Sequence, residues 1–421
     1  MGAVCHNAAA LHESPVHAGV QGVKKEVSVG DLRFGMYVAE LDRPWTETTF
    51  AFQGFLLSNK TQLDALHRYC KYVLVDTERS DRMVIAQLPE RPAASVRGKT
   101  VYPEAFTPIE SEFLRARDIY AESAAFIDEV LDWAQTGKVL DGRRLREAVT
   151  NITECIVRNP DALLLVARLR GKGTYTLSHA LDVSIYMAVF GRFLQLPRED
   201  IELIGLLGLL QDIGKVKLPN ALIDKTGPLT PEEFELAKTH VAHTVEQLRE
   251  TPDLPPNLPN LAALHHERQD GSGYPKGLKG PEIPLYGSIA AIADTFDALT
   301  KSRPYAHEIS PSNALGVLHD ARGKLFHEAL VEQFIQCIGI FPVGAVVELN
   351  TGEIGIVIAQ NLVRRLKPRV VVVLDAQGLP MRPQKILDLV KEPMATVDEP
   401  YRIRRTLEHS KVSLDPSEFF L

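Results

Sequence analysis

One stretch of the chain, His265-His266-Glu267-Arg268-Gln269-Asp270-Gly271-Ser272-Gly273-Tyr274-Pro275, combines possible metal ligands with a sharply turning backbone. Imidazole and carboxylate groups together are a typical ligand set for first-row transition metals. Gly271 and Gly273 allow the backbone to turn tightly or to approach a ligand closely. Adjacent histidines are often only part of a solvated loop, so this stretch gains its weight from residues elsewhere in the chain.

Further candidates lie near the ends or edges of predicted helices. The full set is His179, Asp212, His240, His265, His266 and Asp294, with Lys215 beside them. Such a set could hold two divalent cations a few ångströms apart, which would clamp the attacking and leaving oxygens of a phosphate ester and supply a hydroxide at neutral pH. Lys215 would add positive charge against a phosphoryl oxygen. The residues alone therefore predict metal-assisted hydrolysis of a phosphoester in a helical domain.

The two aspartates of this set lie in segments that should be buried. The run from Ile201 to Leu210 is apolar on every face and predicts a central helix, which ends just before Asp212. Burying an unpaired charge is costly, so Asp212 requires a cation nearby. Asp294 lies among alanines in the predicted helix 288–300, with no basic residue three or four positions away. A metal ion is its simplest partner, and a hydrogen bond to a neighbouring loop is the alternative.

The angular positions of His240 and His243 on their predicted helix indicate which of them can reach an interior site. The helix that begins at Thr230-Pro231-Glu232-Glu233, with Thr230 as N-cap and a glutamate at N3, carries His240 and His243. At about 100° per residue, His240 lies on the edge of the apolar stripe and His243 points nearly opposite to it. We expect only His240 to reach an interior site. Asp182, one turn after His179, is either a carboxylate that orients that imidazole or a surface residue.

The hydrophobic pattern predicts a mainly α fold with smaller segments on both sides of a helical domain. We expect a disordered tail at 1–25, a small α/β domain at 26–91, a linker at 92–102, an all-helical domain at 103–341 and a small β-rich region at 342–421. Trp45, Phe50, Phe52 and Phe55 cluster in the α/β domain. We interpret them as its core; an exposed aromatic patch for a partner is the alternative.

Composition excludes several classes of protein. The chain has 421 residues, of which 45% are hydrophobic and 24% charged, as in ordinary globular proteins. The net charge of -7 and the pI near 6.0 argue against a general binder of nucleic acid or anionic membranes. No apolar run is long enough to span a bilayer, no secretory signal is present, and four scattered cysteines indicate a reducing compartment. We expect a cytoplasmic protein.

Taken in order, the motifs resemble those of the HD-GYP family, a branch of the HD-domain phosphohydrolases that hydrolyses the bacterial second messenger cyclic di-GMP. The resemblance covers roughly residues 175–334, and Gly273-Tyr274-Pro275 matches the triplet that gives the family its name. The other matching segments are Asp212 to Lys215, Lys225 to Thr230, Ile292 to Asp294, and Arg303-Pro304-Tyr305. The region 27–76 is similar to a small N-terminal domain, of regulatory role, that is often joined to HD-GYP domains.

The resemblance implies a role for each matching residue. It makes His179, Asp212, His240, His265, His266 and Asp294 ligands of two divalent metal ions, iron or manganese, with Asp212 bridging both. Lys215 would contact the scissile phosphate and Arg303 the other phosphate of the ligand. Tyr274 would shape the wall of the site, and we place Asp270 with it among the substrate-binding residues.

Three positions depart from the family pattern. The histidine of the His-Asp pair is replaced by Gln211, whose amide oxygen is neutral and a weaker ligand than imidazole. One of the two metal sites should therefore bind its ion less tightly. Tyr175 stands where some members carry a glutamate that supports a third metal, so we expect two metals at most. Ala306 occupies a position where a second basic phosphate contact is common.

Two functions of different class follow from these residues. The first is a phosphodiesterase that opens cyclic di-GMP to linear pGpG and could continue to GMP. The second is a degenerate member that binds cyclic di-GMP or a signalling partner without hydrolysis, and it rests on Gln211. We favour the enzyme, because only one ligand of the set is altered. Other signalling proteins could bind through the N-terminal domain, and a homodimer is among the open oligomeric states.

Overall fold

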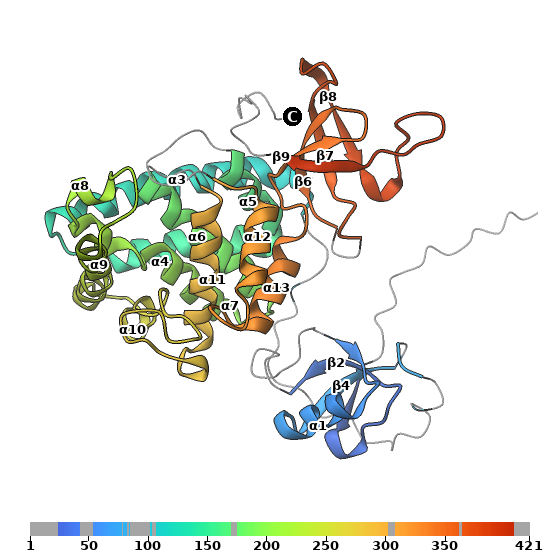
Figure 1. Ribbon diagram of the computed structural model, residues 1–421, viewed down its shortest axis with the longest axis horizontal. Helices are drawn as coiled ribbons and strands as arrows, with labels where there is room; N and C mark the ends of the chain where they lie inside the picture. The colour runs from blue at the N-terminus through green and yellow to red at the C-terminus, as the bar shows by residue number, and fades with distance from the viewer. Residues whose placement is uncertain are drawn as a thin grey trace, which may run out of the picture. The chain divides into compact units, whose positions relative to one another are not determined.

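The computed structural model describes residues 24–42, 54–77, 79–81, 84, 102, 107–169, 175–301, 308–361 and 364–407. The chain forms two compact units, Met1–Ser95 and Val96–Leu421 (Figure 1). Each unit has its own hydrophobic core. The two units are therefore described separately.

Where the structure describes it, the first unit is a small antiparallel sheet with the helix α1 (Lys60–Tyr69) and the short 3-10 helix η1 (Val29–Asp31). Its strands are β1 (Lys24–Ser28), β2 (Tyr37–Leu41), β3 (Phe55–Leu56) and β4 (Tyr72–Asp76), in the sheet order β1-β4-β2-β3. The helix α1 begins at Asn59, whose side chain accepts the Gln62 N–H. Leu66 of this helix packs with Val38 and Val73 of the sheet. Of the predicted aromatic cluster, Phe55 packs on this core, whereas Trp45, Phe50 and Phe52 lie outside the described residues.

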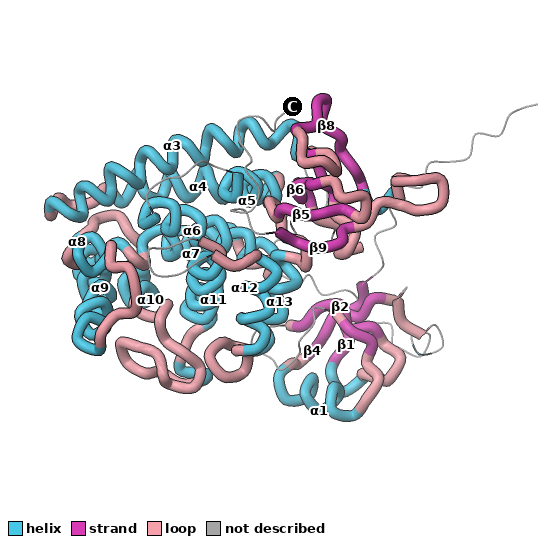
Figure 2. The backbone as a smooth tube through the Cα atoms, turned by 45° about the horizontal axis from the view of Figure 1, so that its top comes forward, coloured by secondary structure: helices cyan, strands magenta, loops and turns pink. Residues whose placement is uncertain are grey.

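Helices make up most of the second unit. They are α3 (Ile109–Thr136), α4 (Gly142–Arg158), α5 (Pro160–Leu169), α6 (Tyr175–Phe193), α7 (Arg198–Leu210), η3 (Ile213–Lys217), α8 (Asn220–Ile223), α9 (Pro231–Glu250), α10 (Leu258–Ala262), α11 (Leu285–Leu299), α12 (Pro311–Asp320) and α13 (Glu328–Ile338). Figure 2 shows the long α3 running along one side of the other helices. The predicted start of α9 is confirmed, because Thr230 and Glu233 form a reciprocal capping box.

The middle of the second unit consists of helices that are buried on most of their surface. The predicted central helix is α7, whose residues from Ile204 to Leu210 are all buried. α11 is buried along Gly287 to Asp294, which includes the predicted alanine-rich face. Phe190 of α6 and Phe296 of α11 both pack edge-on against Phe334 of α13. This apolar packing fixes the ends of α6, α7 and α11, where polar residues of the predicted site lie.

A five-stranded antiparallel sheet completes the second unit. Its strands are β5 (Val346–Leu349), β6 (Ile354–Ala359), β7 (Arg369–Leu374), β8 (Pro380–Asp388) and β9 (Ile403–Leu407), in the order β8-β7-β6-β5-β9. Ile356 and Val371 pack against the helices, while Val357 and Val372 face a separate small core. Both faces of the central strands are thus covered, which explains their continuous apolar runs.

The predicted fold class is confirmed: a mainly α protein with small sheets toward both ends. In the C-terminal sheet, β5 pairs antiparallel with β6 on either side of Asn350-Thr351-Gly352, which form the turn of a hairpin. Within the described residues, no helix is both long enough and apolar enough to cross a bilayer.

Candidate metal centre

A close contact between η3 and α9 brings Asp212 next to His240. Gly214 lies against the α9 backbone, and a Cβ built on it would be 2.2 Å from the His240 carbonyl oxygen. The Gly214 N–H donates to Thr244 Oγ1 at 2.9 Å, and that hydroxyl donates to the Gln211 carbonyl at 3.1 Å. The chain therefore leaves α7 in a fixed direction, with the Asp212 side chain directed to the inner face of α9.

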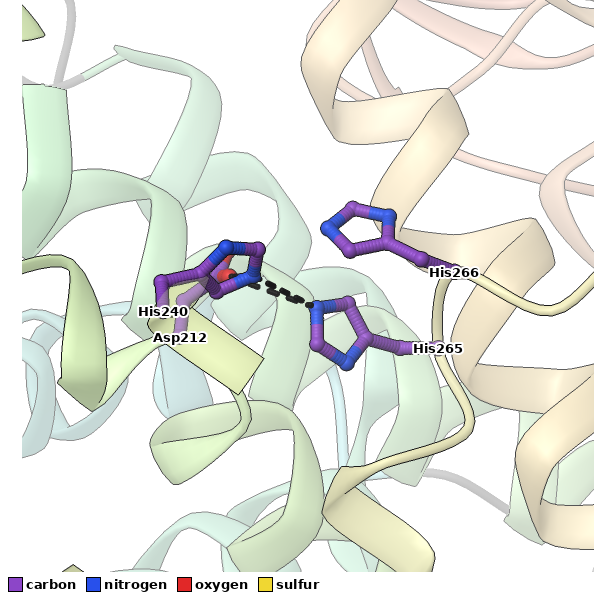
Figure 3. A group of neighbouring side chains, drawn as sticks. All are labelled: Asp212, His240, His265 and His266. Carbon is purple, nitrogen blue, oxygen red and sulfur yellow. Dashed lines mark hydrogen bonds and ion pairs between the residues drawn. The ribbon is translucent and has the colours of Figure 1, made fainter. Parts of the chain in front are cut away.

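Four side chains from three segments converge around this contact. They are Asp212, His240, His265 and His266, whose possible ligand atoms all lie within 4.8 Å of one another. Asp212 Oδ1 lies 3.3 Å from His240 Nε2 and 3.4 Å from His265 Nε2. Figure 3 shows these three side chains pointing toward one another, with His266 facing the same space. His243, which is partly buried one turn after His240, does not belong to either candidate metal group of the described residues.

The protonation of these histidines fits a metal ion. His240 Nδ1 lies 2.6 Å from the Ala237 carbonyl and His265 Nδ1 lies 2.7 Å from the Ala262 carbonyl, so each Nδ1 carries the proton and donates it. Both Nε2 atoms then present lone pairs, and they face each other at 3.4 Å. Asp212 Oδ1 is buried and accepts no hydrogen bond from any residue that the structure describes. The two Nε2 atoms and Asp212 Oδ1 are thus three acceptor atoms that meet in a buried space. A bound cation would offset their mutual repulsion.

A second group shares Asp212 and lies on its other side. It consists of His179, Asp212 and Asp294. His179 Nε2 is 3.0 Å from Asp212 Oδ2 and 3.0 Å from Asp294 Oδ1. Gln211 lies at the same place, where its Nε2 donates to Asp294 Oδ1 at 3.3 Å and its buried Oε1 has no partner among the described residues. This group offers one imidazole, whereas the first offers three.

The electrostatics of the two groups also differ. Burial opposes protonation of His179, but the carboxylates of Asp212, Asp294 and Asp297 raise its pKa to about 10. Burial and the neighbouring His265 hold the pKa of His266 well below its usual range. Burial raises the pKa of the Asp212 carboxyl, but the charge of Lys215 and the hydrogen bond from His179 outweigh it and leave that pKa well below its usual range. The first group is thus ready to coordinate, while the second releases a proton when it binds a cation.

The predicted substrate-binding residues lie in different surroundings. Lys215 Nζ contacts Asp212 Oδ2 at 2.7 Å, so its charge is next to both groups. The Tyr274 ring packs on the His266 imidazole, with centroids 4.6 Å apart. Asp270 is exposed, and its carboxylate accepts the Ser272 N–H and hydroxyl within its own loop. Arg303 lies outside the described residues.

Two buried carboxylates near the site were not singled out from the sequence. Glu267 accepts the backbone N–H groups of Lys276 and Leu278, each at 2.8 Å, and so holds the loop that carries Tyr274. Asp297 lies 2.6 Å from His179 Nδ1. The only sequence signal for Glu267 is its place after two histidines, and for Asp297 its place one turn after Asp294 on α11.

Comparison with known sequences agrees with this geometry. Residues 161–330 match the HD domain family, residues 24–145 a domain of unknown function (DUF3391), and residues 346–406 a KOW domain associated with HD domain. The chain is 31% identical over 373 residues to the cyclic di-GMP phosphodiesterase PA4108 of Pseudomonas aeruginosa, across 87% of this chain and 89% of that protein. The chain belongs to the HD-GYP family. The resemblance seen in its motifs is therefore confirmed.

Two other relatives match a shorter part of the chain. A cyclic di-GMP phosphodiesterase of Thermotoga maritima is 42% identical over 129 residues, which cover 30% of this chain and 35% of that protein. A 3'3'-cGAMP-specific phosphodiesterase of Vibrio cholerae (phosphodiesterase 3) is 36% identical over 149 residues, which cover 35% of this chain and 32% of that protein. The chain thus matches about a third of the length of these two relatives.

Proposed function

We propose that this HD-GYP protein is a metal-dependent phosphodiesterase that hydrolyses cyclic di-GMP to linear pGpG, and that Asp212 bridges two divalent metal ions in its active site. Iron and manganese suit a mixed set of imidazole and carboxylate ligands. The observation that carries the proposal is the pair of ligand groups that meet at Asp212. The full-length similarity to a protein named as a cyclic di-GMP phosphodiesterase supports the substrate.

Each residue has a separate role in this proposal. When bound, the two ions would lower the pKa of a water and polarise the phosphoryl oxygens. Asp212 presents Oδ1 to one group and Oδ2 to the other. Lys215, 2.7 Å from Asp212 Oδ2, would move its ammonium group toward a phosphoryl oxygen as a cation neutralises Asp212. Tyr274, fixed on His266, would limit the space for the substrate on that side.

Gln211 supports the second candidate function, a member that binds the cyclic dinucleotide without hydrolysis. It stands at the group that has a single imidazole, and its amide nitrogen donates to Asp294 Oδ1, which is itself a proposed ligand atom. If the second ion is not retained, the clamp on the leaving oxygen is lost, while the three histidines of the first group can still hold one ion. The nearly complete ligand set favours the enzyme.

One experiment separates the two functions and tests the substrate. Purified protein would be loaded with manganese or iron(II), its metal content measured, and cyclic di-GMP and 3'3'-cGAMP supplied in parallel, because relatives of both names exist. Formation of pGpG, with or without further conversion to GMP, supports the enzyme. Tight binding of cyclic di-GMP without any product would establish the binding protein instead.

A further inference from the structure

A buried network lies behind His179, on the side away from the metal groups. Asp297 Oδ2 accepts the His179 Nδ1–H at 2.6 Å, while Nε2 on the opposite side of the ring faces Asp294 and Asp212. Asp294 and Asp297 are one turn apart on α11. One helix therefore contacts both nitrogens of the imidazole, with a proposed ligand on one side and an orienting carboxylate on the other.

Lys301 holds this orienting carboxylate in place. Its ammonium nitrogen is 2.8 Å from Asp297 Oδ2, 2.8 Å from Asp182 Oδ2 and 2.7 Å from the Ser178 carbonyl. These contacts use all three of its hydrogens. Because Ser178 and Asp182 lie on either side of His179 in α6, Lys301 ties the His179 turn of α6 to the end of α11. Asp297 is fully buried, so its charge is little screened.

The network extends one step further, to α3. The Tyr120 hydroxyl donates to Asp182 Oδ1 at 3.1 Å, so three helices meet at these buried polar groups. Among the residues that the structure describes, two carboxylates and one ammonium leave one net negative charge behind His179. That charge favours a proton on Nδ1 and raises the basicity of Nε2, which is the atom directed toward the second metal group.

We propose that Asp297, held by Lys301, is the positioning residue that allows the second metal group to retain an ion. The proposal rests on the proposed function in so far as it needs two ions. His179 is the single imidazole of that group, and the side chain that lies beside Asp294 there is the amide of Gln211. The affinity of the group therefore depends on the orientation and basicity of one ring, and Asp297 controls both.

The test is the number of manganese ions that full-length Asp297→Asn retains. An asparagine has the same shape but no charge, so it weakens the hydrogen bond from Nδ1 and removes the ion pair with Lys301, which keeps its contacts with Asp182 and Ser178. We expect the affinity for the second ion to fall about 10- to 100-fold while the first ion stays bound. Chelator competition measures both affinities, and electron paramagnetic resonance distinguishes a spin-coupled pair of Mn²⁺ ions in the native protein from an isolated ion in the variant.

Asp161→Asn is the matched control, because it makes the same change at a partly buried aspartate of α5 that belongs to neither metal group. It should retain both ions with native affinity. If Asp297→Asn does not fold, Asp297→Ser gives the same test, because it also removes the carboxylate that accepts the His179 Nδ1–H; a selective loss of the second ion is again expected.

Two results would overturn the proposal. One is native affinity for the second ion in a folded Asp297→Asn protein, and the other is a native protein that never binds more than one ion. Neither readout needs a nucleotide. If the native protein binds two ions and the Asp297→Asn variant binds only one, the positioning role of Asp297 is supported even if cyclic di-GMP is not the substrate.

Discussion

The two halves of this centre are unequal, and Gln211 lies in the half with fewer imidazoles. The group of Asp212, His240, His265 and His266 has three imidazoles, while the group around His179 has one. Burial deprives Gln211 Oε1 of water, and no described residue donates to it. An unsatisfied amide oxygen costs about 1–3 kcal/mol, which contact with a bound cation would offset. The Gln211 side chain is therefore suited to be a weak metal ligand, and its buried oxygen is unfavourable when no cation is bound.

The variants Gln211→Ala and Gln211→His test whether the Gln211 side chain contributes to binding of the second ion. Histidine should raise the affinity for the second ion and the rate of hydrolysis, each about tenfold or more, because imidazole binds these metals better than an amide. Alanine should lower the affinity below that of the native protein. Metal titration and initial rates at saturating metal measure the two effects. Equal second-ion affinity in all three proteins would remove Gln211 from the site.

At this scale the sequence indicated much of the site. The histidines and aspartates chosen for their type and motif order do lie together, although their role as ligands stays a prediction. Asp182 was one candidate to orient His179, yet the carboxylate at His179 Nδ1 is Asp297, and Asp182 contacts Lys301. Helical spacing favours partners on the same helix, so a partner from α11 could not be recognised before the packing of α6 on α11 was known.

Among the elements, the contact of η3 with α9 is the most sensitive to change. A Cβ on Gly214 would lie 2.2 Å from the His240 carbonyl oxygen and 2.5 Å from the Thr244 nitrogen, and backbone atoms of a helix cannot yield. Gly214→Ala should therefore separate Asp212 from His240. We expect a loss of about 3 kcal/mol in stability and a lower affinity for both ions, because both groups share Asp212.

Thermal unfolding with and without manganese measures this effect. Gly205→Ala offers a comparison on the neighbouring helix α7, where a Cβ would meet the Val149 side chain at 3.0 Å and no backbone atom under 3.4 Å. It should cost less stability than Gly214→Ala and leave the metal content unchanged. Native metal affinity in Gly214→Ala would show that the close approach of η3 to α9 does not position the ligands.

The junction between α5 and β6 predicts a pH dependence of stability. Asp161 Oδ2 accepts the Gln360 N–H at 3.1 Å, but burial outweighs this bond and raises the pKa of Asp161 from 3.8 to about 6. Between these values the folded protein holds a proton that the unfolded chain has released. Raising the pH through this window therefore removes stability, at most about 3 kcal/mol, and the loss is complete above pH 6.

Asp161→Asn should remove this part of the pH dependence. The variant should unfold at a higher temperature than the native protein at pH 8 and at a similar temperature near pH 4, since an amide cannot ionise and still accepts the Gln360 N–H. Unfolding curves of both proteins from pH 4 to pH 8 measure the difference. Parallel curves for the two proteins would show that Asp161 titrates normally.

Element boundaries were predictable where capping residues or apolar runs marked them, as at the start of α9 and along α7. The last two strands were not predicted. β8 contains Pro380 and Pro383, and β9 carries three polar residues in succession, Arg404, Arg405 and Thr406. Both strands lie at the edges of the sheet, where proline and charged residues are tolerated because one side of the backbone needs no strand partner.

Over the whole molecule, the centre connects segments that are far apart in the sequence. Its residues come from α6, the α7–η3 junction, α9, the loop after α10, and α11. A cation bound there stabilises the folded chain in proportion to its affinity, by about 2.7 kcal/mol at a hundredfold excess over the Kd. Removing metal with a chelator should lower the unfolding temperature of the second unit by about 5 °C.

Readdition of manganese should restore that temperature, and Asp212→Ala should unfold at the same temperature with and without metal. The first unit, Met1–Ser95, has its own core and contributes no residue to the candidate metal groups. Its unfolding should not respond to the chelator. A chelator effect of equal size in Asp212→Ala would show that the stabilising metal binds elsewhere.

Hydrolysis of cyclic di-GMP by the manganese-loaded full-length protein, with Asp212→Ala beside it, tests the central claim most directly. The native protein should bind two ions and release pGpG, and Asp212→Ala should lose both ions and at least about 10³-fold in rate. A native protein that holds two ions yet leaves cyclic di-GMP intact, or an Asp212→Ala protein that hydrolyses it at the native rate, would contradict the account.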